Sequence, residues 1–446
     1  MTLAAILEGV VRPYAWGSRT AIASLRGKPV PSPHPEAELW FGAHPGGPAV
    51  CIDAGETRTD LPGTDPLRTD LLSRIEADPV ANLGAVSVAE FGGRLPFLLK
   101  ILAAAEPLSL QAHPSSEQAR EGFARENAAG LPVDASNRNY RDPWHKPELI
   151  VALTEFDALA GFRSPARTIE LMRELQVSEL DRYLGMLVGQ PDAEGLRALF
   201  TTWLTLPESA IGVLVPAVLN AAVNVLGAGG GSFDAELRTV LELGERYPND
   251  PGVLAAMLLN RVRLQPGQGL YLPAGNLHAY LDGTGVEIMA NSDNVLRGGL
   301  TPKHIDVPEL LRVLDFSPVE EADLTPTIRT VGAERVYLTP APEFRLSRVE
   351  LDGTGLRHAS SICFDMPGPQ ILVVLTGSIE VRPVGETPFV VASGQAAWLS
   401  DADPDVVIRA ASSRAVFFRA RVPVGADVVV PEQSVSGADG FGQFSS

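Results

Sequence analysis

A glutamine and a histidine stand two residues apart in the stretch LSLQAHP, as Gln111 and His113. If this stretch is a strand, both side chains point to one face, because side chains alternate along a strand with a period of two. An amide oxygen and an imidazole on one face are ligands that a divalent metal can use. Taken alone, the fragment favours the simpler alternative of two polar side chains satisfied at the end of a strand.

A second histidine follows a predicted turn in GQGLYLPAGNLHAY, where the spacing G-x5-P-x-G-x2-H ends at His278. Proline and glycine turn the chain sharply and place His278 at the start of the next strand, with Tyr280 on the same face. This spacing resembles the second metal-binding motif of the cupin superfamily, whose jelly-roll interior holds a divalent metal. The Asn that this motif has four residues after the histidine is replaced here by Asp282.

The stretch HKPELIVAL supplies a carboxylate, because Glu148 opens an apolar run that is typical of a buried strand. Lys146 shares the face of Glu148, whereas His145 lies on the opposite face and is expected to be structural. A glutamate at the start of a strand is usually solvated, so Glu148 alone does not indicate a site.

Together these stretches offer one amide oxygen, two imidazoles and one carboxylate. Such a set suits a zinc ion with an open position for water or substrate. A 2-His-1-carboxylate iron site could also be drawn from three of these residues. The candidate ligands are Gln111, His113, Glu148 and His278.

The pattern of apolar, Gly and Pro residues along the chain predicts the strands and helices that position these residues. Residues 1–153 and 263–320 contain short apolar runs broken by Gly and Pro, which predict one antiparallel sandwich. Residues 154–262 have helical spacing and predict an all-helical insertion, and 321–430 predict a second sandwich without metal. The tail 431–446 is small, polar and Gly-rich, and we expect it to be disordered. The predicted fold is mainly β with an α-helical insertion, and the resemblance to cupins implies that its two sandwiches are cupin-type jelly rolls beside the helical domain.

Composition narrows the classes of function. The 446 residues exceed one ordinary core and predict two or three domains, and an apolar fraction of 45% is enough to bury those cores. A net charge of −18 argues against nucleic-acid binding, which needs a basic face. We find no N-terminal export signal and expect no apolar run near eighteen residues, so we expect neither export nor a membrane. Two cysteines, Cys51 and Cys363, exclude a disulfide framework and a thiolate zinc site and favour the cytoplasm.

Longer stretches resemble one enzyme family. HAYLDGTGVEIMANSDNVLRGGLTPK, from His278 to Lys303, closely resembles the signature of type I phosphomannose isomerases of the cupin superfamily, and YRDPWHKPE resembles a second signature. YAWGS, AELWFGAHP and PLSLQAHP match further blocks in the family's order. The resemblance implies a cytoplasmic aldose–ketose isomerase with one zinc per chain. It would interconvert mannose 6-phosphate and fructose 6-phosphate through an enediol and feed mannose and GDP-mannose metabolism.

Carried over by position, the resemblance gives zinc ligands at the four residues already assembled and a catalytic arginine at Arg297. Because an enediol reaction needs a base and a stabiliser of negative charge, Glu287 and Lys146 are candidates for the proton shuttle. Glu287 could instead pair with a cation, and Lys146 could bind a sugar hydroxyl. Arg297 could hold either the enediolate or the phosphate. The other candidate substrate contacts are Lys100 and Ser109 for the phosphate, Tyr280 in the pocket and Trp16 as a wall.

Two positions depart from the family pattern. Trp144 replaces an Asn and could reshape one wall of the pocket, and Gly298 replaces an Ala. Lys100 stands in the apolar run FLLKIL, where the alternative to an anion contact is a lysine at a strand edge that reaches solvent. The rival functions are a non-catalytic sugar-binding cupin and an iron-dependent cupin dioxygenase. We expect a monomer whose partner is a small sugar phosphate, without nucleic acid or membrane.

Overall fold

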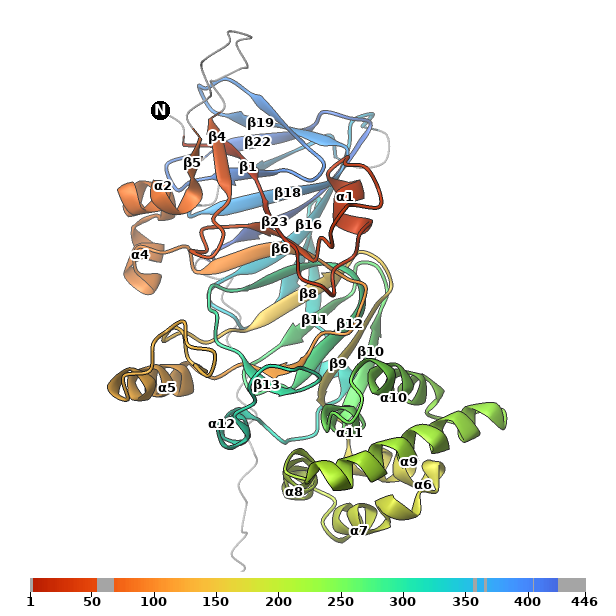
Figure 1. Ribbon diagram of the computed structural model, residues 1–446. Coiled ribbons are helices and arrows are strands. Elements are labelled where there is room, and N and C mark those ends of the chain that lie inside the picture. The colour runs from red at the N-terminus through yellow and green to blue at the C-terminus, as the bar shows by residue number, and fades with distance from the viewer. Residues whose placement is uncertain (1–2, 54–67, 356–358, 365–366, 404, 424–446) are drawn as a thin grey trace, which may run out of the picture.

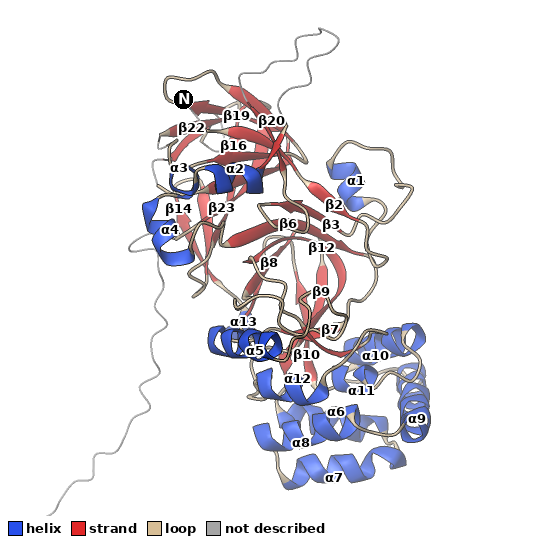
Figure 2. Ribbon diagram, turned by 60° about the vertical axis from the view of Figure 1, so that its left-hand side comes forward, coloured by secondary structure: helices blue, strands red, loops and turns tan. Residues whose placement is uncertain are grey.

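The computed structural model describes residues 3–53, 68–355, 359–364, 367–403 and 405–423. Strands form the body of the molecule, and most of the longer helices gather at one end of it (Figures 1 and 2). The sheet-rich fold with a helical part agrees with the prediction. The predicted disordered tail, 431–446, lies outside the described residues.

A ten-stranded sheet carries the predicted site residues. Its main path is β10-β9-β12-β6-β3-β2, and β7, β8, β11 and β13 pair beside that path. β12 links the two parts, because its first residues pair with β7 and β9 and its later residues pair with β6 and β8. The strands are β2 (Val10–Arg12), β3 (Glu38–Phe41), β6 (Phe97–Ala104), β7 (Leu110–Ala112), β8 (Glu148–Ala152), β9 (Phe156–Phe162), β10 (Leu259–Leu264), β11 (Gly269–Leu272), β12 (His278–Ala290) and β13 (Leu296–Gly299).

The C-terminal strands form two further sheets. A nine-stranded sheet has the order β14-β15-β16-β23-β18-β21-β1-β4-β5, and a four-stranded sheet has the order β17-β22-β19-β20. The strands of the larger sheet are β14 (Thr327–Val331), β15 (Glu334–Leu338), β16 (Arg345–Asp352), β23 (Arg414–Arg421), β18 (Gln370–Thr376), β21 (Ala396–Leu399), β1 (Ala5–Glu8), β4 (Val50–Asp53) and β5 (Thr69–Asp70). Those of the smaller are β17 (Ser361–Phe364), β22 (Val406–Ala410), β19 (Ser378–Pro383) and β20 (Phe389–Ala392).

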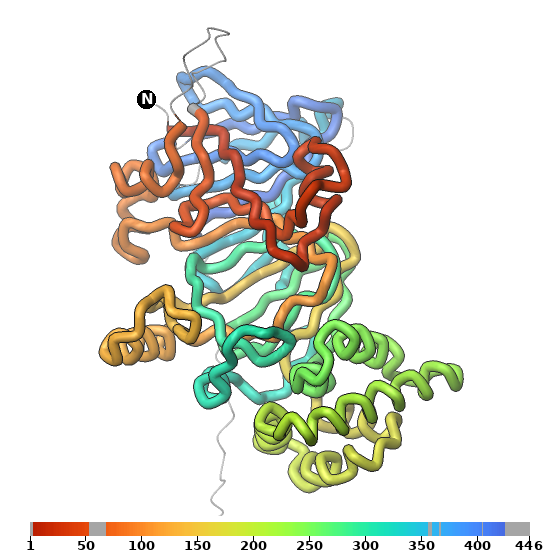
Figure 3. The backbone as a smooth tube through the Cα atoms, in the orientation of Figure 1, coloured from red at the N-terminus to blue at the C-terminus, as the bar shows by residue number. Residues whose placement is uncertain are grey.

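Strand pairing departs from the expected domain division near the N-terminus. The division assigned 1–153 to the catalytic part, but β1 pairs with β21 and places Ala5 opposite Trp398. The N-terminal strands β1, β4 and β5 therefore extend the sheet of the C-terminal part, and Figure 3 shows this early segment beside the last strands of the chain. The sequence pattern could not predict this pairing, because the periodicity of a strand does not identify the strand with which it pairs. The division into domains itself stays a prediction.

Apolar cores fill the spaces on both sides of the nine-stranded sheet. Alternate residues of β21 point to opposite sides, so that Trp398 joins the core shared with β3 and β6, and Leu399 joins the core toward the four-stranded sheet. A third core, which includes Phe156 and Tyr280, lies within the ten-stranded sheet. The sheets are thus fixed against one another by buried side chains, as the alternation of strands requires.

The helical segment is shorter than predicted. Residues 154–262 were expected to be all-helical, but β9 and the start of β10 fall inside this range and pair with each other. The first helix of this segment is capped by its own sequence, because Ser164 Oγ accepts the N–H of Arg167 and Pro165 is the first helical residue. The helices between these strands are α6 (Pro165–Leu175), α7 (Asp181–Gly189), α8 (Ala193–Leu204), α9 (Glu208–Gly227), α10 (Asp234–Arg246) and α11 (Gly252–Ala256). The other helices are α1 (Ala21–Leu25), α2 (Leu71–Ala77), α3 (Pro79–Leu83), α4 (Ala85–Phe91), α5 (Ser116–Ala128), α12 (Val307–Val313) and α13 (Glu321–Leu324).

Helix α9 corrects one expectation from composition. It is long and apolar enough to cross a membrane by length and composition, although no such run was expected. Only 28% of its most apolar window is buried. One side packs into the core of the helical layer through Ile211, Leu214, Val215, Val218 and Ala222.

Candidate metal centre and active site

The neighbouring strands β12, β7 and β13 place His278, Gln111 and Arg297 side by side across the sheet. β7 lies between β12 and β13, where Gln111 is directly opposite His278 on one side and Arg297 on the other. Residues directly opposite each other in a sheet share a face. The strand predicted around Gln111 is confirmed but short, and His113 follows one residue after its end.

The turn before β12 ties two candidate ligands together. Gly275 has a φ of +78°, and its N–H donates to the carbonyl oxygen of His113 at 2.9 Å. A Cβ atom there would lie 3.1 Å from the carbonyl oxygen of Val313, so both conformation and space favour glycine. The Pro-x-Gly-x-x-His spacing therefore places His278 and also fixes the backbone of His113.

Both histidines are held in the tautomer that suits a metal ligand. Nδ1 of His113 contacts the carbonyl oxygen of Asn294 at 2.7 Å, and Nδ1 of His278 contacts that of Asn276 at 2.9 Å. Because a carbonyl oxygen only accepts, each Nδ1 must carry the proton, which leaves the lone pair on Nε2. Burial lowers the pKa of His113 to about 4, so its ring is neutral near pH 7.

The free ends of these rings converge on Glu148. Nε2 of His113 lies 3.3 Å from Oε1 of Glu148, and Nε2 of His278 lies 3.4 Å from Oε2. Within the described chain, neither Nε2 atom nor Oε2 has a partner with hydrogen-bond geometry. Lone pairs directed at one another in a buried site repel unless a cation lies among them. The three ligand atoms lie within 4.8 Å of one another and therefore fit a divalent metal with nitrogen and oxygen ligands.

The carboxylate of this group is kept ionised. Glu148 begins β8, as predicted, and its side chain is buried. Burial opposes its charge, but Lys146, with Nζ 3.2 Å from Oε1, is the main opposing effect, and the pKa of Glu148 lies well below its usual range. A charged oxygen ligand is thus present at neutral pH.

A second buried group joins three strands. Lys100 of β6 lies opposite Glu287 of β12, and its Nζ is 2.6 Å from Oε2 of Glu287 and 3.6 Å from Oε1 of Glu38. The hydroxyl of Tyr280 donates to Oε1 of Glu287 at 2.8 Å. Lys100 lies on an interior strand and is buried, so it is not a lysine at a strand edge.

Burial and the neighbouring charges shift the pKa values of Glu287, Lys100 and Tyr280. Burial raises the pKa of Glu287, and the ion pair with Lys100 offsets only part of that rise. For Lys100 the balance is reversed: burial opposes its charge, but Glu287 and Glu38 outweigh burial and raise its pKa. Burial and the carboxylate of Glu287 raise the pKa of Tyr280 well above its usual value, so its hydroxyl stays a donor.

A bulge explains how Tyr280 and Glu287 come to face each other. They stand seven residues apart on β12, and an odd separation places residues on opposite faces of a regular strand. The register shifts between Tyr280 and Asp282, and such a shift reverses the alternation. Gly283 follows with a φ of +123°, and a Cβ there would meet the carbonyl oxygen of Glu155 at 2.6 Å.

A cavity of about 560 Å³ brings the predicted residues together. His113 and His278 lie against Glu148 at its wall. Ser109, one residue before β7, lines the cavity beside Gln111, and Trp16 stacks on Tyr14 at 5.8 Å between ring centres. The predicted residues that line the cavity directly are Trp16, Lys100, Ser109, Gln111, Lys146, Glu148, Tyr280, Glu287 and Arg297.

Comparisons with known proteins agree with this geometry. The family profile described as phosphomannose isomerase type I, catalytic domain, matches residues 5–165. The mannose-6-phosphate isomerase of Salmonella typhimurium is 39% identical over 384 residues, which cover 85% of this chain and 93% of that protein. The chain belongs to the type I phosphomannose isomerases. The human mannose-6-phosphate isomerase is 31% identical over 405 residues, with 86% of this chain and 90% of that protein covered.

Solved structures of phosphomannose isomerases share the fold. The crystal structure of the Salmonella typhimurium enzyme bound to its substrate fructose 6-phosphate and zinc aligns with a TM-score of 0.82 and 34% identity. The alignment covers 94% of this chain and 100% of that one. A second crystal structure, of a mannose 6-phosphate isomerase bound with zinc and yttrium, also has a TM-score of 0.82, with 35% identity.

The cavity also contains cations to which the sequence alone assigned no role. Arg141 and Lys303 line it together with Arg297. Burial, and then the like charges of Arg297 and Arg141, lower the pKa of Lys303, and burial and Arg141 lower that of Arg297. Across the described residues, no carboxylate forms an ion pair with these three cations. Arg141 stands inside the stretch YRDPWHKPE, and Lys303 is the last residue of the block that begins at His278. Their positions in these two signature stretches were the only sign in the sequence that they belong to the site.

The departure at Trp144 lies outside this cavity. Its ring is 39% exposed and lines a neighbouring cavity, and the guanidinium carbon of Arg94 lies 3.8 Å from the ring centre. The expectation that Trp144 reshapes a wall of the site is therefore wrong. Gly298 packs near Leu277, where a Cβ would meet Cδ1 at 3.1 Å, so an alanine would require a small adjustment.

Proposed function

We propose that this chain is a zinc-dependent aldose–ketose isomerase that interconverts D-mannose 6-phosphate and D-fructose 6-phosphate through an enediol. The observation that carries the proposal is the convergence of His113, Glu148 and His278, with unpaired ligand atoms, beside a cavity that holds a buried acid–base pair and unpaired cations. Zinc and fructose 6-phosphate in the solved structure of a relative support the choice of metal and substrate.

The metal would be held by His113, Glu148 and His278, with the amide oxygen of Gln111 as a fourth ligand. Gln111 lies directly opposite His278 on the neighbouring strand, which supports this assignment. Zinc, when bound, supplies a Lewis acid that stabilises negative charge on the sugar oxygens. We propose that the domain that bears the histidines is a cupin-type jelly roll and that the C-terminal domain is a second, metal-free one.

Glu287 is the base that we propose for the carbon proton. It would take the proton from C2 of the aldose and return it to C1, while the hydroxyl proton of O2 passes to O1, so that no atom is gained or lost. Burial raises the pKa of Glu287, which strengthens it as a base. The hydrogen bond from Tyr280 and the ion pair with Lys100 fix the orientation of the carboxylate.

Lys146 is better suited to donate than to accept. Its Nζ lies 3.2 Å from Oε1 of Glu148, and an ammonium group has donors only. We propose that it hydrogen-bonds a sugar oxygen, gives a proton to O1 and then takes the proton of O2, so that it ends as an ammonium again. Trp16 would wall the sugar from solvent.

The phosphate is proposed to lie on Arg297, Arg141 and Lys303. Like charges gathered in one partly buried place destabilise one another, and a dianion would reverse that effect. Ser109 lines the same cavity and can donate its hydroxyl. Lys100, first assigned to the phosphate, has its charge balanced by Glu287 and Glu38, so we now propose that it holds Glu287.

The test is a coupled assay of mannose 6-phosphate turnover on protein of measured metal content. We expect stoichiometric zinc and formation of fructose 6-phosphate. Zinc and substrate binding without turnover would support a sugar-binding cupin instead, and iron with oxygen consumption would support a dioxygenase. A monomeric cytoplasmic enzyme that supplies mannose 6-phosphate to GDP-mannose metabolism is part of the same proposal.

A further inference from the structure

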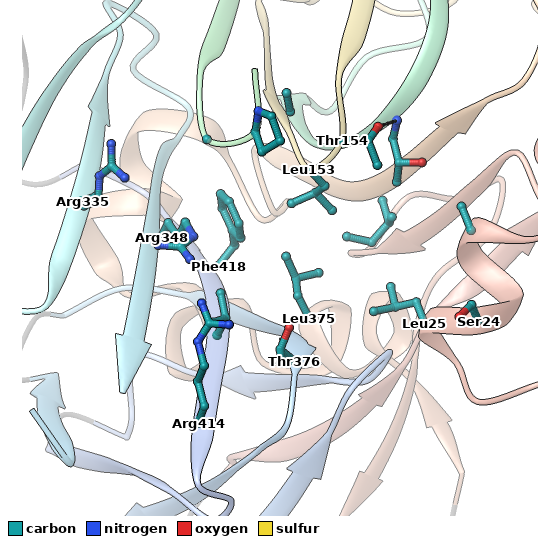
Figure 4. Close-up of a pocket in the computed structure, with 17 residues that line it drawn as sticks. Ser24, Leu25, Leu153, Thr154, Arg335, Arg348, Leu375, Thr376, Arg414 and Phe418 are labelled. Carbon is teal, nitrogen blue, oxygen red and sulfur yellow. Dashed lines mark hydrogen bonds between the residues drawn. The ribbon is translucent and has the colours of Figure 1, made fainter. Parts of the chain in front are cut away.

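A second cavity, of about 540 Å³, lies on the other side of the strands that carry the active site. Lys100 of β6 lines the active-site cavity, whereas its neighbour Ile101 lines this second one, as the alternation of a strand requires. Thr284 of β12 and Leu153, after the end of β8, also line it. The opposite wall belongs to the nine-stranded sheet, and α1 closes one side (Figure 4).

The lining of this cavity is divided in two. One part of the lining is apolar and includes Leu25, Leu153, Leu375 and Phe418. Arg335, Arg348 and Arg414 lie along one side of it, as Figure 4 shows. An apolar body with a few polar groups at one end is the usual form of a small-molecule site, and the volume lies within the usual range of about 300–1,000 Å³.

The arginines carry more charge than their neighbours balance. Arg335 of β15 lies directly opposite Arg348 of β16, and like charges at directly opposed positions destabilise a sheet. Glu350 accepts from Arg348 Nη2 at 2.9 Å and from Arg414 Nε at 2.7 Å. The Arg335 guanidinium has neither an ion pair nor a hydrogen bond to any described residue. Glu350 therefore serves Arg348 and Arg414, whereas no described carboxylate pairs with Arg335, in a chain whose net charge is −18.

We propose that this cavity is a second ligand site, which takes a small organic anion with an apolar ring or chain. The apolar part would lie on Leu375 and Phe418, and the anionic group would lie between Arg335 and Arg348. A guanidinium fork binds a carboxylate, sulfonate or phosphate through paired N–H donors. The site is separate from the sugar phosphate site, because the sheet itself stands between the two cavities.

The test uses 8-anilinonaphthalene-1-sulfonate, a fluorescent sulfonate with aromatic rings, titrated into the full folded chain. We expect one saturable site per chain and an increase in fluorescence. Arg335→Ala should weaken binding about tenfold, because a charge-assisted hydrogen bond is lost. Arg335 is exposed and has no partner in the described fold, so the variant should fold normally. The matched control is Arg409→Ala, which removes an exposed arginine from β22 and should leave binding unchanged.

A second variant tests the apolar part. Thr376→Trp should fill the cavity from its exposed wall and abolish the saturable signal. Saturating fructose 6-phosphate should not displace the probe from the wild-type chain. Equal binding by wild type and Arg335→Ala, retention of the signal in Thr376→Trp, or displacement by fructose 6-phosphate would each overturn the proposal.

Discussion

Two groups of cations line the active-site cavity and differ in what balances their charge. Lys100 and Lys146 each lie beside a buried carboxylate, at 2.6 Å from Glu287 and 3.2 Å from Glu148. Arg297 and its neighbours at the other end form no such pair within the described residues. Arg297 is half-buried and its neighbours Arg141 and Lys303 are exposed, and like charges close together destabilise one another unless an anion lies among them. We therefore infer that the paired lysines hold the catalytic carboxylates, whereas the unpaired cations are arranged for an anion that arrives with the substrate.

The largest loss of activity is expected from removing a histidine that faces the carboxylate of Glu148. His278→Ala removes one imidazole, so the zinc content should fall. Turnover should decrease by more than the roughly 10–100-fold that loss of a supporting group around a metal typically costs. Metal analysis and the coupled assay on one sample provide the measurement. His34→Ala, an exposed histidine outside the group, is the control, and full zinc content in His278→Ala would remove this residue from the ligand set.

The next largest effect is expected at Glu287, where a substitution should slow the proton transfer without weakening substrate binding. Glu287→Gln keeps the shape and the hydrogen bond from Tyr280 but cannot take a proton. We expect kcat to fall by about 10²–10⁴, the usual contribution of a general base. The KM and zinc content should change little. Wild-type kcat in a zinc-replete variant would transfer the role of base to another group.

Lys100→Met tests whether this lysine is a partner of carboxylates or of phosphate. Removing one member of a buried ion pair leaves Glu287 and Glu38 without a counter-charge, at a cost of about 3–5 kcal/mol in the free energy of unfolding. Denaturant titration measures this cost, with the exposed Lys28→Met as the matched control. Unchanged stability together with a raised KM would restore the original assignment of Lys100 to the phosphate.

The smallest effect is expected at the unpaired cations. Lys303→Met should raise the KM for mannose 6-phosphate about tenfold, since one charge-assisted contact is lost. Stability should not fall, because no carboxylate in the described part of the chain depends on Lys303. Inhibition by inorganic phosphate should weaken in parallel. An unchanged KM and unchanged phosphate inhibition would contradict the assignment of the substrate phosphate to this cluster.

The proposed metal ligands could be predicted because each one depends on local sequence. Gln111 and His113 have strand spacing, His278 follows a Pro-Gly turn, and Glu148 begins an apolar strand. In each case neighbouring residues fix the direction of the side chain. The residues alone already gave one ligand set, and the resemblance to phosphomannose isomerases then gave that set a reaction.

The remainder depends on contacts between distant segments. The bulge near Tyr280 turns Glu287 to the same side, and simple alternation predicts the opposite. The pairing of β1 with β21 joins an early segment of the chain to a late one, and no local pattern encodes that choice. The cations Arg141 and Lys303 stand in signature stretches, but only the folded cavity brings them to Arg297.

The most direct test of the central claim is zinc titration of the metal-stripped protein with isomerase activity as the readout. Dialysis against a chelator should abolish the conversion of mannose 6-phosphate to fructose 6-phosphate. Adding zinc should restore it in proportion, up to one equivalent per chain. Full activity in protein without measurable metal would contradict the account.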